Sequence, residues 1–427
     1  MNSFTNVQQT QKEKVVLVAL QQQNQNPYEI EESLDELNQL SLTVHAEVVG
    51  KFIQKRERPD PKTYIGIGKA KEVAITAKES EAGTVIFNND LTPSQQGNLE
   101  EIMDLKIIDR TALILDIFAQ HAHSNEGKLQ VELAQLNYML PRLIGRGIEL
   151  SRLGGGIGTR GPGETKLEVD RRRIKRRIQN LKRGLTELDE IRFLQRKQRK
   201  KSRVFGISLV GYTNAGKSTL LNKITSAGVL VQDKLFATLD STSRKFILPS
   251  NREVVISDTV GFIRELPHQL IASFKSTLDE IKEANLILHI IDSSHPKMSE
   301  QIVVVEKTLE EIGASERLRL NIFNKVDKIS WIQLERLKRE FSDALFISAL
   351  KNLGIDDLLK QIDEITSQDT VKVSLDIPYD KGEFVQMAYQ LGRVVSEKHV
   401  SSGTILVTEI PKPHLSKFKR FFKKDTE

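Results

Sequence analysis

Phe205-Gly206-Ile207-Ser208-Leu209-Val210 runs directly into Gly211-Tyr212-Thr213-Asn214-Ala215-Gly216-Lys217-Ser218, and this stretch decides the fold. Its first part is mostly apolar and long enough for a strand, and residues 219–224 after the loop have a helical pattern. Strand, glycine-rich loop and helix in this order are the setting of a P-loop. The glycines let backbone N–H groups close around phosphates, and the helix N-terminus adds partial positive charge. The sequence therefore predicts an α/β domain that binds the phosphate chain of a nucleotide.

Two side chains of this loop have distinct expected roles. We expect Lys217 to reach the β- and γ-phosphates, and we expect the Ser218 hydroxyl to bind Mg²⁺. A second motif, Asp258-Thr259-Val260-Gly261, follows the strand-like residues 254–257. There Asp258 can hold the magnesium ion through its hydration shell, and the Gly261 amide can sense the γ-phosphate.

Two later motifs are suited to a guanine base. Asn324-Lys325-Val326-Asp327 follows the strand-like residues 320–323, and Ser348-Ala349 follows residues 345–347. The Asp327 carboxylate can accept both N–H donors on the guanine edge, a pairing that adenine does not offer. The Ala349 amide can complete the base pocket. Because open α/β sheets bind ligands at the carboxyl ends of their strands, these motifs together predict a Mg²⁺-dependent GTPase.

The segment between the first two motifs contains Phe236-Ala237-Thr238-Leu239-Asp240. We expect Thr238 to complete the magnesium coordination when GTP is bound; a helix-capping threonine is the alternative. Catalysis is then assigned to Lys217, Thr238 and Gly261, and metal binding to Ser218, Thr238 and Asp258. The full set expected to line the nucleotide site is Gly211, Tyr212, Thr213, Asn214, Ala215, Gly216, Lys217, Ser218, Thr219, Phe236, Thr238, Asp258, Thr259, Val260, Gly261, Asn324, Lys325, Asp327, Ser348 and Ala349.

One position departs from Ras-like GTPases, in which a glutamine directly after the glycine of the second motif orients the attacking water. Here that position is Phe262, whose ring cannot hydrogen-bond water. We therefore expect slow intrinsic hydrolysis that depends on a partner. Asn214 offers a carbonyl oxygen close to the phosphates, and we hypothesise that it holds K⁺ there, which would replace the charge of an arginine.

The chain should contain further domains, because 427 residues exceed what one hydrophobic core usually holds. Residues 1–108 alternate strand-like and amphipathic helical runs, which predicts a small α/β domain with mostly parallel strands. Gly66-x-Gly68 in this domain is interpreted as a plain strand-to-helix turn rather than a phosphate site. The GTPase domain is expected at residues 204–367 and a small α/β domain at residues 368–427. The phenylalanines near the end are expected to be core residues rather than a nucleic-acid platform: Phe418, Phe421 and Phe422.

Residues 109–203 are predicted to form a helical hairpin. Apolar residues recur at spacings of four and three in residues 129–143 and again in residues 174–188, so each stretch has one apolar stripe. Two such helices joined by one loop pair most simply as an antiparallel hairpin. Pro141 should end or kink the first helix, and Thr165-x-x-Glu168 should cap the second.

The hairpin region is rich in glycine and in positive charge. Its loop, residues 144–165, contains eight glycines and three arginines. A disordered linker is one interpretation. We prefer a recognition loop that becomes ordered when it binds RNA, because flexible segments with arginine commonly fold on binding RNA. Residues 166–203 carry sixteen Lys or Arg and five Asp or Glu, a balance of +11, so the rest of the chain sums to −5 within a total of +6. This segment is expected to bind a polyanion, and the candidate RNA-binding residues are Arg146, Arg152, Arg160, Arg171, Arg172, Arg173, Lys175, Arg176 and Arg177.

The composition limits the class of protein further. The chain contains no cysteine, which excludes a disulfide scaffold and cysteine-ligated zinc and suits a reducing compartment. Its first residues lack the apolar stretch of a signal peptide, and no apolar run is long enough to span a bilayer. We therefore expect a cytoplasmic monomer without a membrane span.

These features resemble the HflX family of GTPases over essentially the whole chain. The most specific match is Gly161-Pro162-Gly163-Glu164-Thr165-Lys166-Leu167-Glu168, followed by Asp170-Arg171-Arg172-Arg173. Residues 236–240 and Phe262 also match that family's pattern. Lys166 departs from it, since glutamine is expected at that position.

The resemblance implies an N-terminal α/β domain, a helical hairpin, a GTPase domain and a small C-terminal domain. It also implies that the protein binds the large ribosomal subunit, that the ribosome stimulates GTP hydrolysis, and that the protein splits stalled or idle ribosomes under heat or other stress. The glycine–arginine loop would then reach toward the peptidyl transferase region. The residues alone leave two alternatives: a GTP-dependent factor for RNA modification or ribosome assembly, and a switch that acts at a membrane or on a protein partner.

Overall fold

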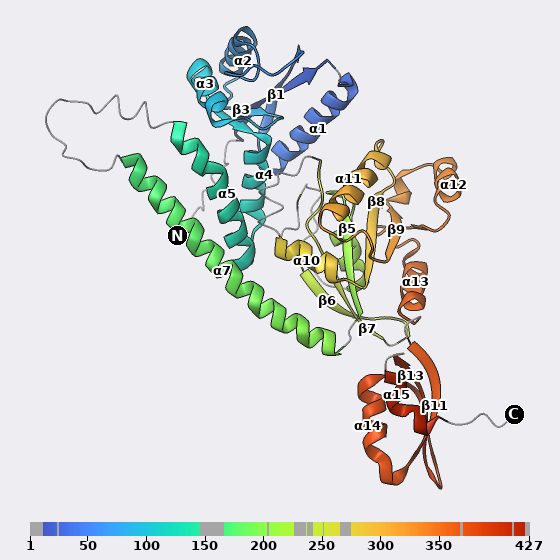
Figure 1. Ribbon diagram of the computed structural model, residues 1–427. Helices are drawn as coiled ribbons and strands as arrows, with labels where there is room; N and C mark the ends of the chain where they lie inside the picture. The colour runs from blue at the N-terminus through green and yellow to red at the C-terminus, as the bar shows by residue number, and fades with distance from the viewer. Residues whose placement is uncertain are drawn as a thin grey trace, which may run out of the picture.

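The computed structural model of the chain describes residues 12–23, 25–145, 166–202, 205–225, 236, 242–250, 252–264, 275–367, 370–411 and 414–422. Figure 1 shows an N-terminal α/β unit, two long helices beside it, a central α/β unit and a C-terminal unit that projects at the far end. The fold class predicted from the sequence, a multidomain α/β protein with a helical hairpin, is confirmed.

The N-terminal unit is built on a parallel four-stranded sheet in the order β2-β1-β3-β4. Alternate side chains of the central strand enter two different cores: Leu17 lies in the core with α1 and α4, and Val18 lies in the core with α2 and α3. A strand buried on both faces has a continuous apolar sequence, as residues 15–20 do. The strands are β1 (Lys14–Gln22), β2 (Glu47–Arg56), β3 (Thr84–Phe87) and β4 (Lys106–Asp109).

Four helices cover this sheet: α1 (Pro27–Thr43), α2 (Ile67–Glu79), α3 (Pro93–Met103) and α4 (Arg110–His121). A capping box of Thr92 and Gln95 fixes the start of α3. Gly66 is the N-cap of α2, at a strand-to-helix connection. Although the hairpin region was expected to start at residue 109, α4 buries Ile114 and Phe118 in the same core as α1. It therefore covers one face of the N-terminal sheet.

The helical hairpin consists of α5 (Asn125–Gly145) and α7 (Lys166–Ser202). Leu133 packs with Ile178 and Leu181, in a cluster that also contains Leu129, Leu136, Leu140, Ile174 and Leu185. Earlier residues of α5 meet later residues of α7, since Gly184 lies against Leu129, so the pair is antiparallel as predicted. Pro141 does not end α5, which continues to Gly145. At 1.5 Å per residue, α7 is about 55 Å long and extends from the hairpin to the central unit (Figure 1).

The central unit contains a six-stranded sheet in the order β10-β9-β8-β5-β7-β6, in which only β6 is antiparallel to its neighbour. The strands are β5 (Phe205–Gly211), β6 (Thr242–Ile247), β7 (Glu253–Asp258), β8 (Leu286–Asp292), β9 (Arg319–Asn324) and β10 (Leu345–Phe346). Its helices are α8 (Lys217–Thr225), α10 (Lys275–Glu283), α11 (Met298–Glu311), η1 (Val326–Lys328), α12 (Trp331–Glu340) and α13 (Ile355–Ser367). This is the P-loop domain predicted from the sequence.

The C-terminal unit is an antiparallel three-stranded sheet in the order β11-β13-β12, with helices packed on it. Phe418 and Phe421 are buried in its core, so the prediction that these aromatics are core residues is confirmed. An ion pair between Arg252 and Glu409 links this unit to the central unit. Its elements are β11 (Thr370–Pro378), η2 (Tyr379–Lys381), α14 (Gly382–Leu391), β12 (Arg393–Val400), β13 (Gly403–Pro411), α15 (Leu415–Phe418) and η4 (Lys419–Phe421).

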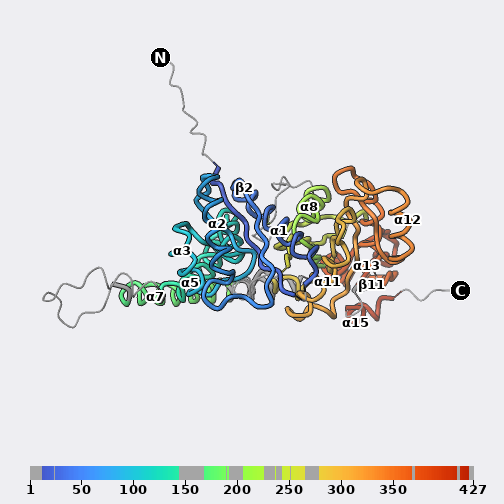
Figure 2. The backbone as a smooth tube through the Cα atoms, turned by 90° about the horizontal axis from the view of Figure 1, so that it is seen from above, coloured from blue at the N-terminus to red at the C-terminus, as the bar shows by residue number. Residues whose placement is uncertain are grey.

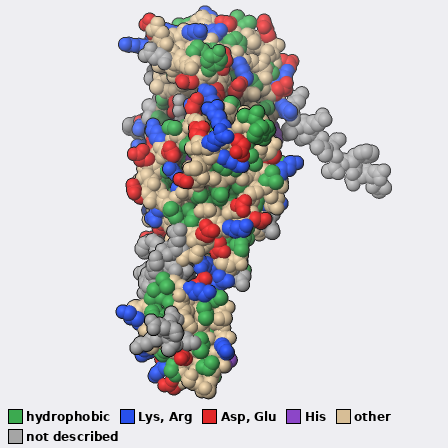
Figure 3. Space-filling view, turned by 90° about the vertical axis from the view of Figure 1, so that its right-hand side faces the viewer, with side chains coloured by type: hydrophobic (Ala, Val, Ile, Leu, Met, Phe, Trp, Pro, Cys, Tyr) green, Lys and Arg blue, Asp and Glu red, His purple; other side chains and the backbone are tan. Residues whose placement is uncertain are grey.

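The N-terminal and central units share one hydrophobic core. Leu37 of α1 and Phe118 of α4 belong to the same buried cluster as Tyr212, Phe262 and Leu278 of the central unit. Seen from above, α1 lies between the two units (Figure 2). On the face that Figure 3 shows, acidic and basic side chains are interspersed over both units, and the C-terminal unit forms a separate narrow lobe.

Candidate GTP-binding site

The P-loop connects β5 to α8 and has the backbone geometry that phosphate binding needs. Gly216 has a positive φ of 96°, and a Cβ atom there would lie 2.3 Å from Asn324 Nδ2. Only glycine fits this position. The Lys217 ammonium group is buried and donates hydrogen bonds to the carbonyl oxygens of Gly211 at 3.1 Å and Tyr212 at 2.9 Å. Burial lowers the pKa of Lys217 to about 8, so an arriving phosphate would stabilise its charged form.

The expected magnesium ligands Ser218 and Asp258 lie together. The Ser218 hydroxyl donates to Asp258 Oδ2 at 2.7 Å, and Asp258 is fully buried at the end of β7. A hydroxyl and a carboxylate beside a phosphate chain are the oxygen ligands that Mg²⁺ prefers. These residues therefore fit a magnesium ion that would neutralise charge on the β- and γ-phosphates. The third expected ligand, Thr238, lies outside the described residues.

The segment expected to sense the γ-phosphate lies directly on the P-loop. A Cβ atom on Gly261 would be 2.9 Å from Thr213 Cα and 3.0 Å from Lys217 Nζ, so only glycine permits this approach. The Thr259 hydroxyl donates to the Leu209 carbonyl oxygen at 2.7 Å and holds the start of the segment to β5. Val260, which follows it, is buried in the shared core. The geometry agrees with a Gly261 amide placed beside the γ-phosphate.

The base-recognition motifs are joined to the P-loop by one side chain. Asn324 is buried, donates to the Ala215 carbonyl oxygen at 2.9 Å and accepts from the Ala349 N–H at 3.0 Å. The Ala349 amide, which we expected to contact the base, is therefore bonded to Asn324. Asp327 is exposed on η1, where its carboxylate is accessible to a base. Ser348 is fully buried, and its hydroxyl accepts from the Lys351 N–H at 3.0 Å.

Phe236, which was expected to line the nucleotide site, belongs to the core that the N-terminal and central units share. Its ring is 2% exposed and packs edge-on against Phe118 of α4, with ring centroids 4.7 Å apart. The aromatic side chain therefore packs against an apolar partner across the domain boundary. Phe262, at the position of the missing glutamine, is also buried in the shared core. Sequence position alone did not indicate these interdomain contacts.

The structure adds two residues that the motifs did not indicate, Asp292 and Glu36. Asp292, at the carboxyl end of β8, forms an ion pair with Lys325 at 2.7 Å. The rule that polar residues at strand ends face the ligand could have identified it. Tyr212 donates from its hydroxyl group to Glu36 of α1. Burial and the nearby Glu36 carboxylate raise the pKa of Tyr212, so the phenol stays protonated and remains a donor.

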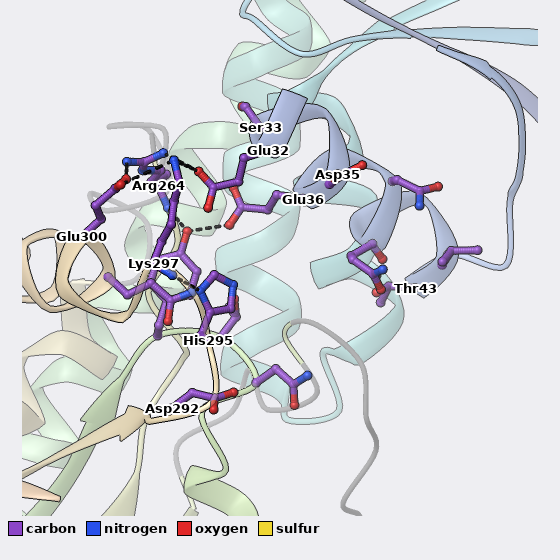
Figure 4. A pocket seen from close by; sticks show the side chains of 17 residues that line it. Glu32, Ser33, Asp35, Glu36, Thr43, Arg264, Asp292, His295, Lys297 and Glu300 are labelled. Carbon is purple, nitrogen blue, oxygen red and sulfur yellow. Dashed lines mark hydrogen bonds and ion pairs between the residues drawn. The ribbon is translucent and has the colours of Figure 1, made fainter. Parts of the chain in front are cut away.

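A cavity of about 570 Å³ lies beside the P-loop, between α1 and the central unit (Figure 4). Thr213 and Asn214 of the P-loop line it together with Asp292 and His295. On its rim, Arg264 forms ion pairs with Glu300 and with Glu32 of α1, and Lys297 pairs with the same two carboxylates. The N-terminal unit therefore contacts the central unit through charged groups as well as through the shared core.

The expected RNA-binding residues of α7 are exposed. The exposed residues are Arg171, Arg172, Arg173, Lys175 and Arg176. Arg177 is also exposed, but it donates from two nitrogens to the Glu132 carboxylate, at 2.6 and 2.7 Å, and so holds α7 to α5. Arg146, Arg152 and Arg160 lie outside the described residues. Among the helices that the structure does describe, none is both long and apolar enough to cross a bilayer.

Comparisons with known proteins agree with this architecture. Three families match in succession: GTP-binding GTPase N-terminal at residues 31–119, GTP-binding GTPase Middle Region at residues 121–199, and 50S ribosome-binding GTPase at residues 206–325. The chain is 49% identical over 399 residues to the GTPase HflX of Caldanaerobacter subterraneus subsp. tengcongensis, with 93% of this chain and 91% of that protein covered. It is 42% identical over 376 residues to the GTPase HflX of Escherichia coli (strain K12), with 88% of each covered.

Among solved structures, a GTP-binding protein from Sulfolobus solfataricus in complex with GDP is similar to this chain. It is 27% identical, with 83% of this chain and 99% of that chain covered and a TM-score of 0.44. The family assignment comes from the two curated relatives, which match nearly the whole chain at 42% and 49% identity. The chain belongs to the HflX family of GTPases and is a GTP hydrolase.

Proposed function

We propose that this GTPase binds the large ribosomal subunit and splits stalled or idle ribosomes under stress, with hydrolysis stimulated by the ribosome. The observation that carries this proposal is the match of residues 206–325 to the family described as 50S ribosome-binding GTPase, next to an exposed basic helix. Its site of action would be the cytoplasm, and the active form would be a monomer.

The basic helix supplies the physical reason for an RNA partner. Five exposed cationic side chains lie within residues 171–176 of α7, so their charges act on one short surface. Cations that contact RNA phosphates release condensed counterions, which drives binding and makes it depend on salt. The ion pair of Arg177 with Glu132 and the apolar stripe keep α7 fixed to α5, so this surface is preorganised.

The nucleotide site supplies the switch. With GTP and Mg²⁺ bound, Ser218 and Thr238 would ligand the metal, Asp258 would hold its hydration shell, and the Gly261 amide would bind the γ-phosphate. That state would dock the protein on the large subunit, and hydrolysis would release it. Because Phe262 is buried and cannot orient water, the large subunit would have to supply or position the missing catalytic group.

The test compares GTP hydrolysis by the protein alone, with purified large subunits, with small RNAs and with anionic vesicles. We expect stimulation by large subunits only, and we expect intact ribosomes to dissociate when GTP or a non-hydrolysable analogue is present. A rate that does not respond to large subunits would refute the proposal. Stimulation by isolated RNA instead would support a factor for RNA modification or ribosome assembly, and stimulation by vesicles would support a membrane switch.

A further inference from the structure

The P-loop tyrosine joins three parts of the molecule through one hydroxyl group. Tyr212 donates a hydrogen bond to Glu36 Oε1 on α1 and accepts one from the backbone N–H of Arg264 at 3.0 Å. The tyrosine is buried, at 7% exposed, and both it and Glu36 border the cavity beside the P-loop. One phenol thus connects the N-terminal unit, the P-loop and the segment that follows Gly261.

Glu36 is itself fixed by a buried cation. Its second carboxylate oxygen pairs with Arg110, which is 3% exposed and donates to Asn88 Oδ1 at 3.1 Å. Moving the carboxylate would leave a buried phenol without its acceptor and a buried guanidinium without its charged partner, which is costly. The N-terminal unit therefore presents Glu36 to the P-loop as an acceptor with little freedom to move.

The segment that Tyr212 holds is bound to the P-loop at two more points. The Thr213 N–H donates to the Phe262 carbonyl oxygen at 2.8 Å, and the Phe262 N–H donates to the Gly211 carbonyl oxygen at 3.1 Å. The bond from the Arg264 N–H to Tyr212 is the third, and it is the one that involves a side chain. These three hydrogen bonds hold residues 262–264 against the P-loop.

This fastening determines where Gly261 lies. Gly261 directly precedes the bonded residues and packs so closely that an added Cβ would be 3.0 Å from Lys217 Nζ. Its amide is the group expected to meet the γ-phosphate. In this protein the position of that amide matters more than in Ras-like enzymes, because Phe262 replaces the glutamine that would otherwise orient the attacking water.

We propose that Glu36 is a positioning residue of the GTPase site: acting through Tyr212, it keeps Gly261 where its amide meets the γ-phosphate. The inference rests on the nucleotide site proposed above. GDP lacks the γ-phosphate, so the contact favours GTP over GDP and supports hydrolysis. The N-terminal unit, whose sheet lies outside the GTPase domain, thereby contributes a residue to the nucleotide preference of that domain.

The test uses the full chain with Glu36→Gln, Tyr212→Phe and the double variant. Affinities for GDP and for a non-hydrolysable GTP analogue are measured by calorimetry with Mg²⁺, and hydrolysis is measured in single turnover. Each single variant should lower the ratio of GTP-analogue to GDP affinity by about tenfold, the size expected for a hydrogen bond to a charged group. Hydrolysis should slow by a similar factor, and GDP affinity should fall clearly less than the affinity for the GTP analogue.

The double variant separates positioning from a merely structural role. If Glu36 acts through Tyr212, the double variant has the same affinity ratio as Tyr212→Phe, because the second change removes nothing further. Tyr212→Phe keeps the pair of Glu36 and Arg110, so it remains informative if Glu36→Gln folds poorly. Tyr389→Phe is the matched control, because that hydroxyl donates to Glu397 in the C-terminal unit at 2.6 Å.

Three results would overturn the inference: an unchanged affinity ratio in folded Tyr212→Phe, faster hydrolysis in that variant, or additive effects in the double variant. Each leaves nucleotide binding by the unaltered protein intact. Failure of the unaltered protein to bind either nucleotide would instead remove the proposed site. The two failures are therefore distinguished within one set of titrations.

Discussion

Asn324 Nδ2 donates a hydrogen bond to the Ala215 carbonyl oxygen at 2.9 Å, so a side chain at the end of β9 supports the middle of the P-loop. The same amide accepts from the Ala349 N–H at 3.0 Å and is 2% exposed. One buried side chain thus links the loop for the phosphates to both loops for the base. Its removal should affect every nucleotide that uses this site.

We predict that Asn324→Ala lowers the affinities for GDP and for a GTP analogue together, by about tenfold or more, because two buried hydrogen bonds are removed. Calorimetry with Mg²⁺ measures both affinities. Asn98→Ala is the control, since Asn98 donates to the Lys62 carbonyl oxygen at 2.8 Å in the N-terminal unit. A decrease confined to the GTP analogue would contradict a role in loop support, because GDP uses the same loops.

Asp327 tests base recognition. It is exposed, so Asp327→Asn should leave the thermal midpoint of unfolding nearly unchanged. The neutral amide cannot accept both N–H donors of guanine as a carboxylate does, so GTP affinity should fall by about tenfold to a hundredfold. ATP affinity should not fall, and the preference for guanine should therefore decrease. Competition of both nucleotides against a fluorescent GDP analogue measures this, with Asp343→Asn as control; a preserved preference would exclude Asp327 as the reader of the base.

Asn214 tests the potassium hypothesis. It is exposed, lines the cavity and has a φ of 60°, a backbone conformation that glycine adopts without strain. Hydrolysis stimulated by large subunits should be faster in K⁺ than in Na⁺ at equal ionic strength. Asn214→Gly tolerates the backbone conformation and should remove that difference while leaving GDP affinity nearly unchanged. Equal rates in both salts with the unaltered protein would show that no monovalent cation acts there.

The sequence predicts the parts of the site that lie within single strand–loop units. The apolar runs of β5, β7, β8 and β9 can each be recognised in the sequence by themselves. A parallel sheet then places their carboxyl ends along the same edge, and this does not depend on the other domains. This is why Ser218 and Asp258 were expected to be neighbours although forty positions separate them.

Contacts between domains could not be predicted in the same way. Glu36 looks like any acidic residue on the polar face of a helix, and its partner Tyr212 is 176 positions away. No spacing rule relates such residues, because the pairing depends on how the N-terminal and central units pack against each other. Phe236 shows the same limit: its neighbours in the sequence suggested a nucleotide contact, but a hydrophobic partner on α4 decides where its ring lies.

His289 gives a prediction for pH. It lies buried in β8, and burial, with Arg319 nearby, lowers its pKa from 6.5 to about 4. In the unfolded chain the imidazole binds a proton near pH 6.5, whereas the folded protein does so only near pH 4. The stability that the lowered pKa of His289 contributes should therefore be fully present above about pH 6.5, and it should be lost as the pH falls toward 4.

We predict that His289→Leu removes this part of the pH dependence. Between pH 7 and 4.5 the unaltered protein should lose about 2–3 kcal/mol of stability relative to the variant, from about two pKa units of difference. Thermal and denaturant unfolding at both pH values measures the change, and His399→Leu, at a largely exposed histidine, is the control. A difference that does not vary with pH would mean that the pKa of His289 is the same in the folded and the unfolded protein.

The basic surface of α7 gives the last prediction. Replacing Arg171, Arg172 and Arg173 by glutamate should weaken binding to large subunits by at least about a hundredfold at low salt, because three attractive interactions with phosphates become repulsive. The dependence of binding on salt should also become shallower, by about one unit of slope for each phosphate that is no longer neutralised. Sedimentation with large subunits at several salt concentrations measures both effects.

The control is a second triple variant, in which glutamate replaces Arg336, Lys338 and Arg339 of α12. It changes the net charge by the same amount at another exposed helix, so this variant should bind large subunits almost as well as the unaltered protein does. Equal weakening in both triple variants would mean that total charge, and not the surface of α7, determines binding to the ribosome.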